Sequence, residues 1–377
     1  MTEILVTDVL VVGEGCAGLT AALAASEVGR DVVLLGDGRP PVTAISTGFL
    51  TYAAHEGFTR DQLLHAMAEA SGKGLCDQAL LGRLIDEAPK ELGETFARHR
   101  IPVERAERGM RARRALGKSG RDLLSGFGTE FHECDSVEDM TGLMREFSST
   151  HGTALYAQLR KAVNTSPKIK RVRGSALVLE PGATAVGALV GGKPVTVAAR
   201  AVILGTGGLQ GLYEFTDTPE TLTGDGHGMA AEAGTALVDM EFIQFYPLAV
   251  REDGIPPLFL YPDFPKLSTL VNDQGENQMA LGPIRDRGRL EEAGTRLMAL
   301  RDEVRGFGWS GYGEMQEVLR VERGIMLSDC LRQAILRRTE SRGAHARSDF
   351  PQTNDAWLKK QVVCVVDGMP RFADAPL

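Results

Sequence analysis

Residues 8–18, DVLVVGEGCAG, decide the fold. The first five form a short apolar run that ends at a glycine, as buried parallel strands do. Gly13, Gly15 and Gly18 fit the G-x-G-x-x-G pattern. In that pattern the first glycine allows a tight turn, the second lets the backbone approach a pyrophosphate, and the third permits close packing of helix on strand. Because the following helix offers free N–H groups and a positive dipole end to an anion, the segment predicts a dinucleotide-binding phosphate loop.

The residues that follow continue this pattern. Residues 19–28 are rich in alanine and are expected to be helical, and residues 31–35, DVVLL, predict a second buried strand, which gives a βαβ start. A carboxylate that binds ribose hydroxyls normally stands at the end of that strand. This chain has Gly36 there and Asp37 next. Asp37 therefore binds ribose after a small shift in register, or it is a surface turn acid, and the sequence leaves both alternatives open.

Length, charge and cysteine usage exclude several classes of protein. With 377 residues the chain is long enough for a large core and two or more domains. A net charge of -8 argues against a general nucleic-acid binder. No apolar run approaches the roughly 20 residues that cross a bilayer, and the N-terminus lacks the basic region of a signal peptide. The five cysteines form no C-x-x-C, so no metal or iron–sulfur site is predicted and a reduced, cytoplasmic setting is expected.

The rest of the chain predicts a mixed architecture. Helices are expected at 59–71, 77–99, 140–148 and 152–163, and Pro89 is expected to kink or split the second of them. A β-meander is expected at 174–179, 185–190 and 194–198, followed by a separate buried strand at 201–204. Amphipathic helices at 290–305 and 313–338 and a short strand at 361–366 complete the chain.

Four further motifs identify a family. They are VILGTGG at 202–208, TGDGHG at 223–228, MEFIQFYP at 240–247, and ESRGAHAR at 340–347, which is followed by RSDFP and WLK. Together with the phosphate loop they resemble the succinate dehydrogenase/fumarate reductase flavoprotein family, whose members include L-aspartate oxidase. The resemblance covers residues 6–250 and about 313–365. It implies an α/β fold: a Rossmann-like FAD-binding domain with a β-meander, a reduced cap region and a C-terminal helical domain.

The resemblance also implies FAD as the cofactor and assigns residues to it. The positions that match cofactor-binding positions of the family are Gly13, Gly15, Ala17, Gly18, Gly36, Asp37, Thr43, Ser46, Thr47, Gly48, Thr206, Gly207 and Asp225. In respiratory members a histidine in the segment under the isoalloxazine binds FAD covalently. Val42 stands at the matching position here, so the resemblance implies non-covalent FAD.

The sequence departs from the family at the substrate side. Members that act on succinate or fumarate carry Phe-His-Pro-Thr, whereas this chain has Phe245-Tyr246-Pro247-Leu248. A dicarboxylate site needs charge-assisted donors, and neither Tyr246 near neutral pH nor Leu248 supplies one. The family's later substrate-histidine and second flavin-binding blocks are also missing. This gap is either a natural deletion or a loss from the sequence, and the sequence does not decide between them.

Arg285 and Tyr246 are the candidate catalytic residues. Arg285-Asp286 matches an Arg-Asp pair of the family whose arginine delivers a proton to the substrate carbon. Ile284 interrupts the match, which favours a surface ion pair over a proton shuttle. Tyr246 replaces the substrate-side histidine and can donate a hydrogen bond.

The function that the resemblance implies is an FAD-dependent oxidoreductase. It would move two electrons between a small, carboxylate-bearing substrate and an external carrier, with an iron–sulfur subunit as the implied electron partner. The alternatives are a non-catalytic or electron-relaying flavoprotein subunit of a larger redox complex, which the missing blocks favour, and a paralogue without cofactor. The predicted domains are 1–248 for FAD binding, 249–305 for the reduced cap and 306–377 for the C-terminal helical domain.

Overall fold

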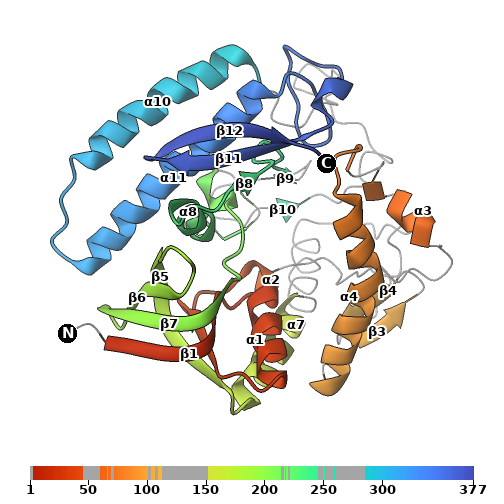
Figure 1. The fold of residues 1–377 in the computed structure, drawn as a ribbon, viewed down its shortest axis with the longest axis vertical. Coiled ribbons are helices and arrows are strands. Elements are labelled where there is room, and N and C mark those ends of the chain that lie inside the picture. The colour runs from red at the N-terminus through yellow and green to blue at the C-terminus, as the bar shows by residue number, and fades with distance from the viewer. Residues whose placement is uncertain are drawn as a thin grey trace.

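The computed structural model describes residues 3–45, 60–65, 67–68, 72–100, 103–106, 109–112, 152–213, 216, 218–219, 221–244, 249–250, 258–259 and 285–377. Within these residues the chain forms two parts, which lie one above the other in Figure 1. A sheet with its covering helices forms the lower part, and a helical hairpin with a small sheet forms the upper part. None of the described helices combines the length and apolarity that a membrane crossing requires.

Five strands form the main sheet. They are β1 (Glu3–Val12), β2 (Val32–Gly36), β5 (Ile169–Leu179), β6 (Ala185–Val190) and β7 (Lys193–Leu204). β1 pairs in parallel with β2 on one side and β7 on the other, and β2 pairs in parallel with β5. β5, β6 and β7 form an antiparallel meander that closes the sheet into a ring. The predicted Rossmann-like start and β-meander are therefore confirmed.

Two strands are longer than the sequence predicts. The expected strands at 194–198 and 201–204 are one strand, β7, because no glycine or proline follows Pro194 before Leu204. β5 begins at Ile169, and its first residues, up to Arg173, pair with β2. From Gly174 onward the same strand pairs with β6. β5 thus joins the parallel part of the sheet to the meander.

Helices cover the outer face of the sheet. α1 (Cys16–Glu27) and α7 (Gly152–Thr165) pack their apolar side chains on β1 and β2. The buried residues of this cluster are Val11, Leu19, Ala22, Leu23, Val32, Leu34, Leu155, Leu159, Ala162 and Val163. The alternate residues of the same strands face the meander and form a second core with Val186, Val195, Val197 and Met229. Residues 10–12 of β1 and 32–35 of β2 are thus all buried on one face or the other, as the continuous apolar runs require.

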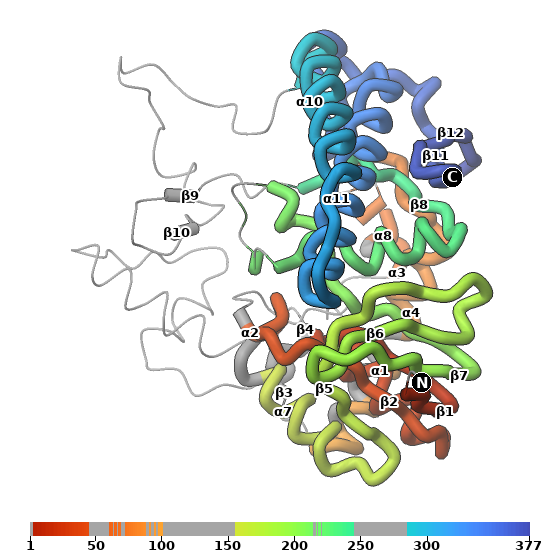
Figure 2. Tube along the Cα trace, turned by 90° about the vertical axis from the view of Figure 1, so that its left-hand side faces the viewer, coloured from red at the N-terminus to blue at the C-terminus, as the bar shows by residue number. Residues whose placement is uncertain are grey.

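The upper part is built around a helical hairpin. α10 (Arg287–Arg305) and α11 (Tyr312–Arg337) lie side by side in Figures 1 and 2. α8 (Asp225–Glu232) packs against α11. β8 (Leu237–Val238), β11 (Lys360–Val366) and β12 (Met369–Ala375) form the small sheet, of which only β11 was expected from the sequence.

The remaining elements belong to neither the main sheet nor the helical hairpin with its small sheet. They are α2 (Val42–Ile45), α3 (Arg60–His65), α4 (Gln78–Arg98), β3 (Val103–Ala106), β4 (Gly109–Ala112), β9 (Ala249–Val250) and β10 (Leu258–Phe259). α4 is continuous across Pro89, so of the two expected effects of this proline, a kink or a split, the split does not occur. A proline removes one helical hydrogen bond, and here that loss does not end the helix. The helix expected at 140–148 lies outside the described residues.

Candidate cofactor site

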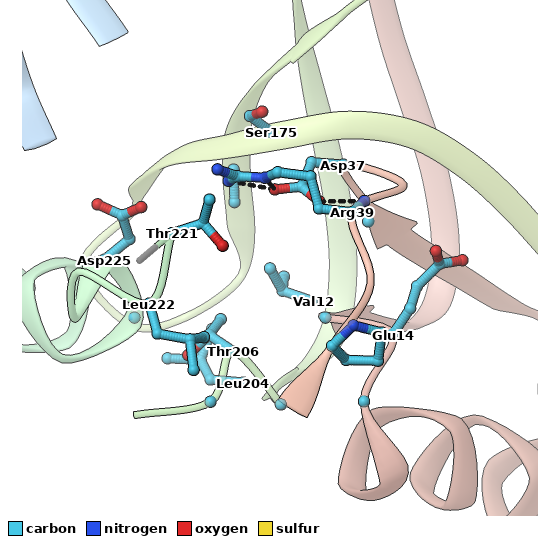
Figure 3. Close-up of a pocket in the computed structure, with 18 of the residues that line it drawn as sticks. Val12, Glu14, Asp37, Arg39, Ser175, Leu204, Thr206, Thr221, Leu222 and Asp225 are labelled. Atoms are coloured by element: carbon cyan, nitrogen blue, oxygen red, sulfur yellow. Dashed lines mark hydrogen bonds and ion pairs between the residues drawn. The ribbon is translucent and has the colours of Figure 1, made fainter. Parts of the chain in front are cut away.

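A cavity of about 580 Å³ lies where β1, β2 and β7 end. Val12, Leu35 and Leu204, the residues at or next to the carboxyl ends of these strands, all line it. Open α/β sheets bind their ligands at this edge. Residues of α8 and α11 line the cavity as well, so both parts of the molecule contribute to it. Figure 3 shows the residues that face one another across this space.

Two glycines of the phosphate loop are required by the packing of the protein itself. Gly13 has φ +108°, a conformation that favours glycine, and a Cβ there would lie 2.2 Å from the carbonyl oxygen of Gly205. A Cβ on Gly18 would lie 2.0 Å from the carbonyl oxygen of Gly13. These short distances show that the backbones of β1, α1 and β7 approach one another closely, as the sequence pattern predicts.

Gly15 is different, because nothing in the described part of the chain requires a glycine there. Its backbone is extended, with φ -77° and ψ -177°, which any residue can adopt. A Cβ would meet only Pro41 and Thr43, each at an ordinary distance of 3.7 Å. Gly15 lines the cavity. A glycine that neither conformation nor packing demands leaves space for a ligand that approaches the backbone, so this loop fits a pyrophosphate.

The N-terminus of α1 opens onto the same cavity. The first amide of the helix, that of Cys16, donates a hydrogen bond to Oγ1 of Thr43 at 2.9 Å. Thr43 belongs to α2 and also lines the cavity, as does Val42. Within the described chain no hydrogen bond takes the amide of Ala17, which lines the cavity too. This amide and the helix dipole suit an anionic group.

The end of β2 differs from the sequence expectation. Gly36 lines the cavity, but the Glu14 side chain passes over it, and a Cβ on Gly36 would lie 2.4 Å from Cγ of Glu14. Arg171 holds the Glu14 carboxylate through Nε at 2.7 Å. Gly36 is therefore required by a neighbouring side chain of the protein, whatever ligand binds.

Asp37 lines the cavity and is also a turn acid, so the two sequence alternatives do not exclude each other. Its carboxylate accepts hydrogen bonds from the backbone N–H of Arg39 at 2.9 Å and from Nε of Arg39 at 2.6 Å. Burial raises the pKa of Asp37, but the hydrogen bonds and charge of Arg39, together with the charge of Arg320, outweigh it and leave this pKa below its usual value. Asp37 is thus ionised near neutral pH and paired (Figure 3).

Residues after β7 form another side of the cavity. Thr206, Gly207 and Asp225 all line it. Gly207 has φ +80°, and a Cβ on Gly226 would lie 1.8 Å from Oγ1 of Thr206, so this loop packs closely on the first turn of α8. Asp225 begins α8 after Gly224, and Figure 3 shows its carboxylate on this side of the cavity.

His227 also lines the cavity. Its Nδ1 is buried and accepts or donates no hydrogen bond within the described chain. Burial lowers the pKa of His227, so the ring is neutral near pH 7.

Helix α11 contributes three residues that the sequence did not single out. Gln316, Arg320 and Arg323 line the cavity. Nε of Arg320 lies 3.4 Å from Oδ2 of Asp225, and its Nη1 donates to Glu317 at 2.8 Å. Arg323 is buried and donates to both carboxylate oxygens of Glu232, at 2.9 and 2.6 Å, and to the carbonyl of Leu177.

Arg285 does not line the described cavity, and the favoured expectation of a surface ion pair is wrong. Its side chain is only 7% exposed, and Nη1 lies 3.2 Å from the carbonyl of Glu241. Asp286 instead caps α10 by accepting from the backbone of Arg289 at 2.9 Å. Burial lowers the pKa of Arg285 below its usual value. Asp286 therefore serves as the helix cap, while the Arg285 side chain is buried.

Several predicted site residues are outside the reach of the structure. Ser46, Thr47, Gly48 and Tyr246 lie outside the described residues. The sequence pattern did not predict Glu14, Arg39 or the residues of α11 as residues of the site. Arg39 stands two residues after Asp37, and its nearness was a usable signal. For Arg320 the sequence offers no signal, because only the packing of α11 on α8 brings it to the cavity.

The comparisons with known proteins agree with this geometry. The family described as FAD binding domain matches residues 8–307, and the family described as fumarate reductase flavoprotein C-term matches residues 276–376. L-aspartate oxidase of Caulobacter vibrioides is 31% identical over 249 residues, which are 64% of this chain and 45% of that protein. L-aspartate oxidase of Agrobacterium fabrum is 30% identical over 282 residues, 73% of this chain and 50% of that protein. The chain spans about half the length of the curated relatives it matches.

Solved structures of low identity share the fold. Quinol fumarate reductase FrdA from E. coli superimposes with a TM-score of 0.74 at 15% identity, covering 100% of this chain and 97% of that chain. The Mycobacterium smegmatis Sdh1 complex gives a TM-score of 0.72 at 17% identity, covering 99% and 94%. The predicted fold class, family and FAD cofactor are confirmed. The chain therefore belongs to the FAD-binding flavoprotein family of the fumarate reductase type, with that family's C-terminal domain after its FAD-binding domain.

Proposed function

We propose that this chain is an FAD-dependent oxidoreductase that moves two electrons between a small, carboxylate-bearing substrate and an external electron carrier. The observation that carries the proposal is Gly15, a glycine that no contact or backbone conformation within the described residues requires, in the lining of a cavity of about 580 Å³. The family match supplies the identity of that ligand. The relatives are named as oxidases, which favours a catalytic role over an electron-relaying scaffold.

The residues present fit FAD. Gly15 and Ala17 would hold the pyrophosphate through backbone N–H groups and the dipole of α1, while Gly13 and Gly18 let the strand and the helix approach closely enough to shape the loop. Asp37 and Asp225 offer carboxylate oxygens to hydroxyl groups of FAD. Thr43, Thr206 and Gly207 line the same cavity. FAD, when bound, supplies two-electron chemistry. Val42 is aliphatic, so we propose that the cofactor is held without a covalent bond.

The substrate side of the proposal rests on Arg285 and Tyr246. Arg285 lies beside the carbonyl of Glu241, on the segment that leads to Tyr246 in the sequence. Its lowered pKa suits a guanidinium that gives up a proton to a relay. Because Leu248 and Tyr246 replace the family's threonine and histidine, we propose a carboxylate substrate other than fumarate or succinate.

An iron–sulfur protein is the proposed electron partner. No C-x-x-C occurs in this chain, so cluster ligands would have to come from another one. The domain limits at 248 and 305 and a cytoplasmic location are part of the same proposal, and both still rest on the sequence pattern alone.

An absorption spectrum of the purified protein tests the cofactor. We expect flavin bands, and after acid precipitation we expect all of the colour in the supernatant, because FAD is not covalently bound. Colour in the pellet would contradict the non-covalent site. A colourless protein that does not take up added FAD would overturn the proposed function.

Anaerobic titration with substrates tests catalysis. We expect one of a panel of small amino, hydroxy and saturated carboxylates to bleach the flavin bands, and an artificial acceptor to restore them. If no carboxylate bleaches the flavin but a reduced iron–sulfur protein does, the electron-relaying alternative holds instead.

A further inference from the structure

We propose that Arg320 is a cofactor-binding residue that the C-terminal domain adds to the FAD site. This inference rests on the proposed function, since it names a further residue of the same site. Arg320 stands on α11, within residues 276–376 that match the C-terminal family, and its side chain is only 17% exposed. The phosphate loop, by contrast, belongs to the other end of the chain.

The geometry leaves one edge of the Arg320 guanidinium for a ligand. Nη1 donates to the two carboxylate oxygens of Glu317 at 2.8 and 2.9 Å, and Nε lies 3.4 Å from Asp225. Within the described chain no hydrogen bond takes Nη2. Arg320 lines the cavity, and an arginine fork that is partly buried is suited to phosphate or to a polarised oxygen.

The charges around Arg320 support an anionic ligand. Its charge reaches Asp37, on the opposite side of the cavity, since it contributes to holding the pKa of that carboxyl below its usual value. Glu317 is 65% exposed, so solvent screens its pairing with Arg320 and it can turn away when a ligand enters. Asp225 is less exposed and stays beside the guanidinium. Arg320 therefore both steadies the Asp225 carboxylate and presents a cation to the cavity.

The neighbouring arginine shows what a purely structural role looks like. Arg323 is 3% exposed, and its Nε and Nη2 are taken by Glu232 and by the Leu177 carbonyl. It ties α11 to α8 and β5. Arg320, one turn earlier on the same helix, makes no such contact with β5 and keeps donor capacity toward the cavity.

The test is the dissociation constant of FAD for apoprotein prepared by removing the bound flavin, measured by quenching of flavin fluorescence. We expect Arg320→Met to weaken binding about ten- to a hundredfold, because a charge-assisted hydrogen bond is lost. Arg320→Lys keeps the charge without the planar fork of donors, so its FAD affinity is expected to lie between those of the wild type and of Arg320→Met. Wild-type affinity should decline more steeply with salt than that of Arg320→Met.

Arg332 provides a matched control. It stands on the same helix, is also 17% exposed and also pairs with an acid three residues away, Asp329, but it does not line the cavity. We expect Arg332→Met to lose similar stability and to bind FAD like the wild type. Equal weakening by both variants would mean that only helix docking was disturbed, and would overturn the inference.

The outcomes separate the two proposals. Wild-type protein that binds FAD, together with an Arg320→Met variant of unchanged affinity and salt dependence, overturns the role of Arg320 alone. Wild-type protein that binds no FAD overturns the proposed function, and this inference with it.

Discussion

Three glycines of one loop are there for two different physical reasons. Gly13 and Gly18 avoid contacts of 2.2 and 2.0 Å with backbone oxygens, whereas Gly15 avoids no close contact among the described residues. A sequence pattern treats the three alike. Their separation matters for mutagenesis, because a substitution at Gly13 or Gly18 disturbs the fold and the ligand site together, while one at Gly15 acts on the ligand alone.

Gly15→Val should therefore abolish flavin retention without unfolding the protein. We expect FAD affinity to fall by roughly a thousandfold or more, because the branched side chain displaces the pyrophosphate from the loop amides and several charge-assisted hydrogen bonds are lost. The melting temperature of the apoprotein should stay within a few degrees of wild type. Both quantities are measured on the same preparation, by fluorescence quenching and by calorimetry.

Gly313→Ala is the control, since a Cβ at that position of α11 would meet open space. Gly13→Val should lower the melting temperature of the apoprotein, unlike Gly15→Val. Yellow Gly15→Val protein would show that no pyrophosphate lies against this loop.

A buried histidine gives the molecule a predictable response to acid. His345 is fully buried and contacts the carbonyl of Arg338 through Nε2 at 3.2 Å, so Nε2 carries the proton. Burial lowers its pKa to about 4; the hydrogen bond to Arg338 opposes this, and the charges of Arg285, Arg338 and Arg347 add to it. In the unfolded chain this ring takes up a proton near pH 6.5.

Because the folded-state pKa is depressed, acid favours the unfolded state. The contribution of His345 to stability is fully present above about pH 6.5 and is lost as the pH falls toward 4, by up to about 3 kcal/mol. Urea unfolding at pH 7.5 and pH 5 measures this loss. His345→Gln should reduce the difference between the two pH values, and His65→Gln, on an exposed helix, should leave it unchanged. An undiminished difference in His345→Gln would assign the acid response to other groups.

At the scale of elements, one buried arginine joins the two parts of the chain. The stem of Arg323 lies so close to α8 that a Cβ on Gly228 would be 2.6 Å from its Cδ. Its guanidinium bonds Glu232 at the end of α8 and the carbonyl of Leu177 in β5. Small residues on α8 and a long cation on α11 thus form one contact.

Arg323→Met should destabilise the protein by about 2 kcal/mol. The change leaves the Leu177 carbonyl unpaired and Glu232 without its cation, and the partial exposure of Glu232 keeps the loss below that of a fully buried pair. Chemical denaturation of the apoprotein measures it. Arg296→Met, which breaks an exposed pair on α10, should change stability by less than about 0.5 kcal/mol. Equal effects of the two variants would contradict the proposed connection.

The elements were predicted where local pattern determines them. The strand ending at Val12, the helix that follows, the meander and the hairpin of α10 and α11 all agree with the sequence. β12 was missed because exposed and charged residues such as Arg371 and Asp374 leave it without a clear alternating pattern. The join of β7 into one strand was missed for a related reason: its pairing with β1 over Glu3–Val12 is a tertiary fact.

The candidate site was predicted only on one side. The phosphate-loop residues could be predicted from the spacing of the glycines, and Asp225 from the TGDGHG motif. Arg39 could have been predicted from its nearness to Asp37 in the sequence, whereas Glu14 and Arg320 reach the cavity through side-chain paths that no spacing encodes. Arg285 was misjudged because its neighbour in sequence, Asp286, turned out to be a helix cap.

At the scale of the whole molecule, the cavity is assembled from distant parts of the chain. Residues 12–17, 35–43, 174–177 and 204–207 line it, together with residues of α8 and with Gln316, Arg320 and Arg323 of α11. A ligand that binds only the folded form stabilises everything that must be in place for it to bind, by about 2.7 kcal/mol at a concentration 100 times its dissociation constant. FAD should therefore protect both parts of the molecule from local opening.

Hydrogen exchange with and without FAD measures this protection. We expect amides of residues 13–18 and of the first half of α11 to exchange up to about a hundredfold more slowly with FAD, because openings that separate α11 from α8 must release the ligand. Strands β3 and β4, which do not line the cavity, should exchange at the same rate in both states. Slower exchange at 13–18 with no change in α11 would mean that the FAD-binding domain holds the cofactor by itself. Protection that reaches α11 in wild type but not in Arg320→Met would place the connection between the two parts at that single side chain.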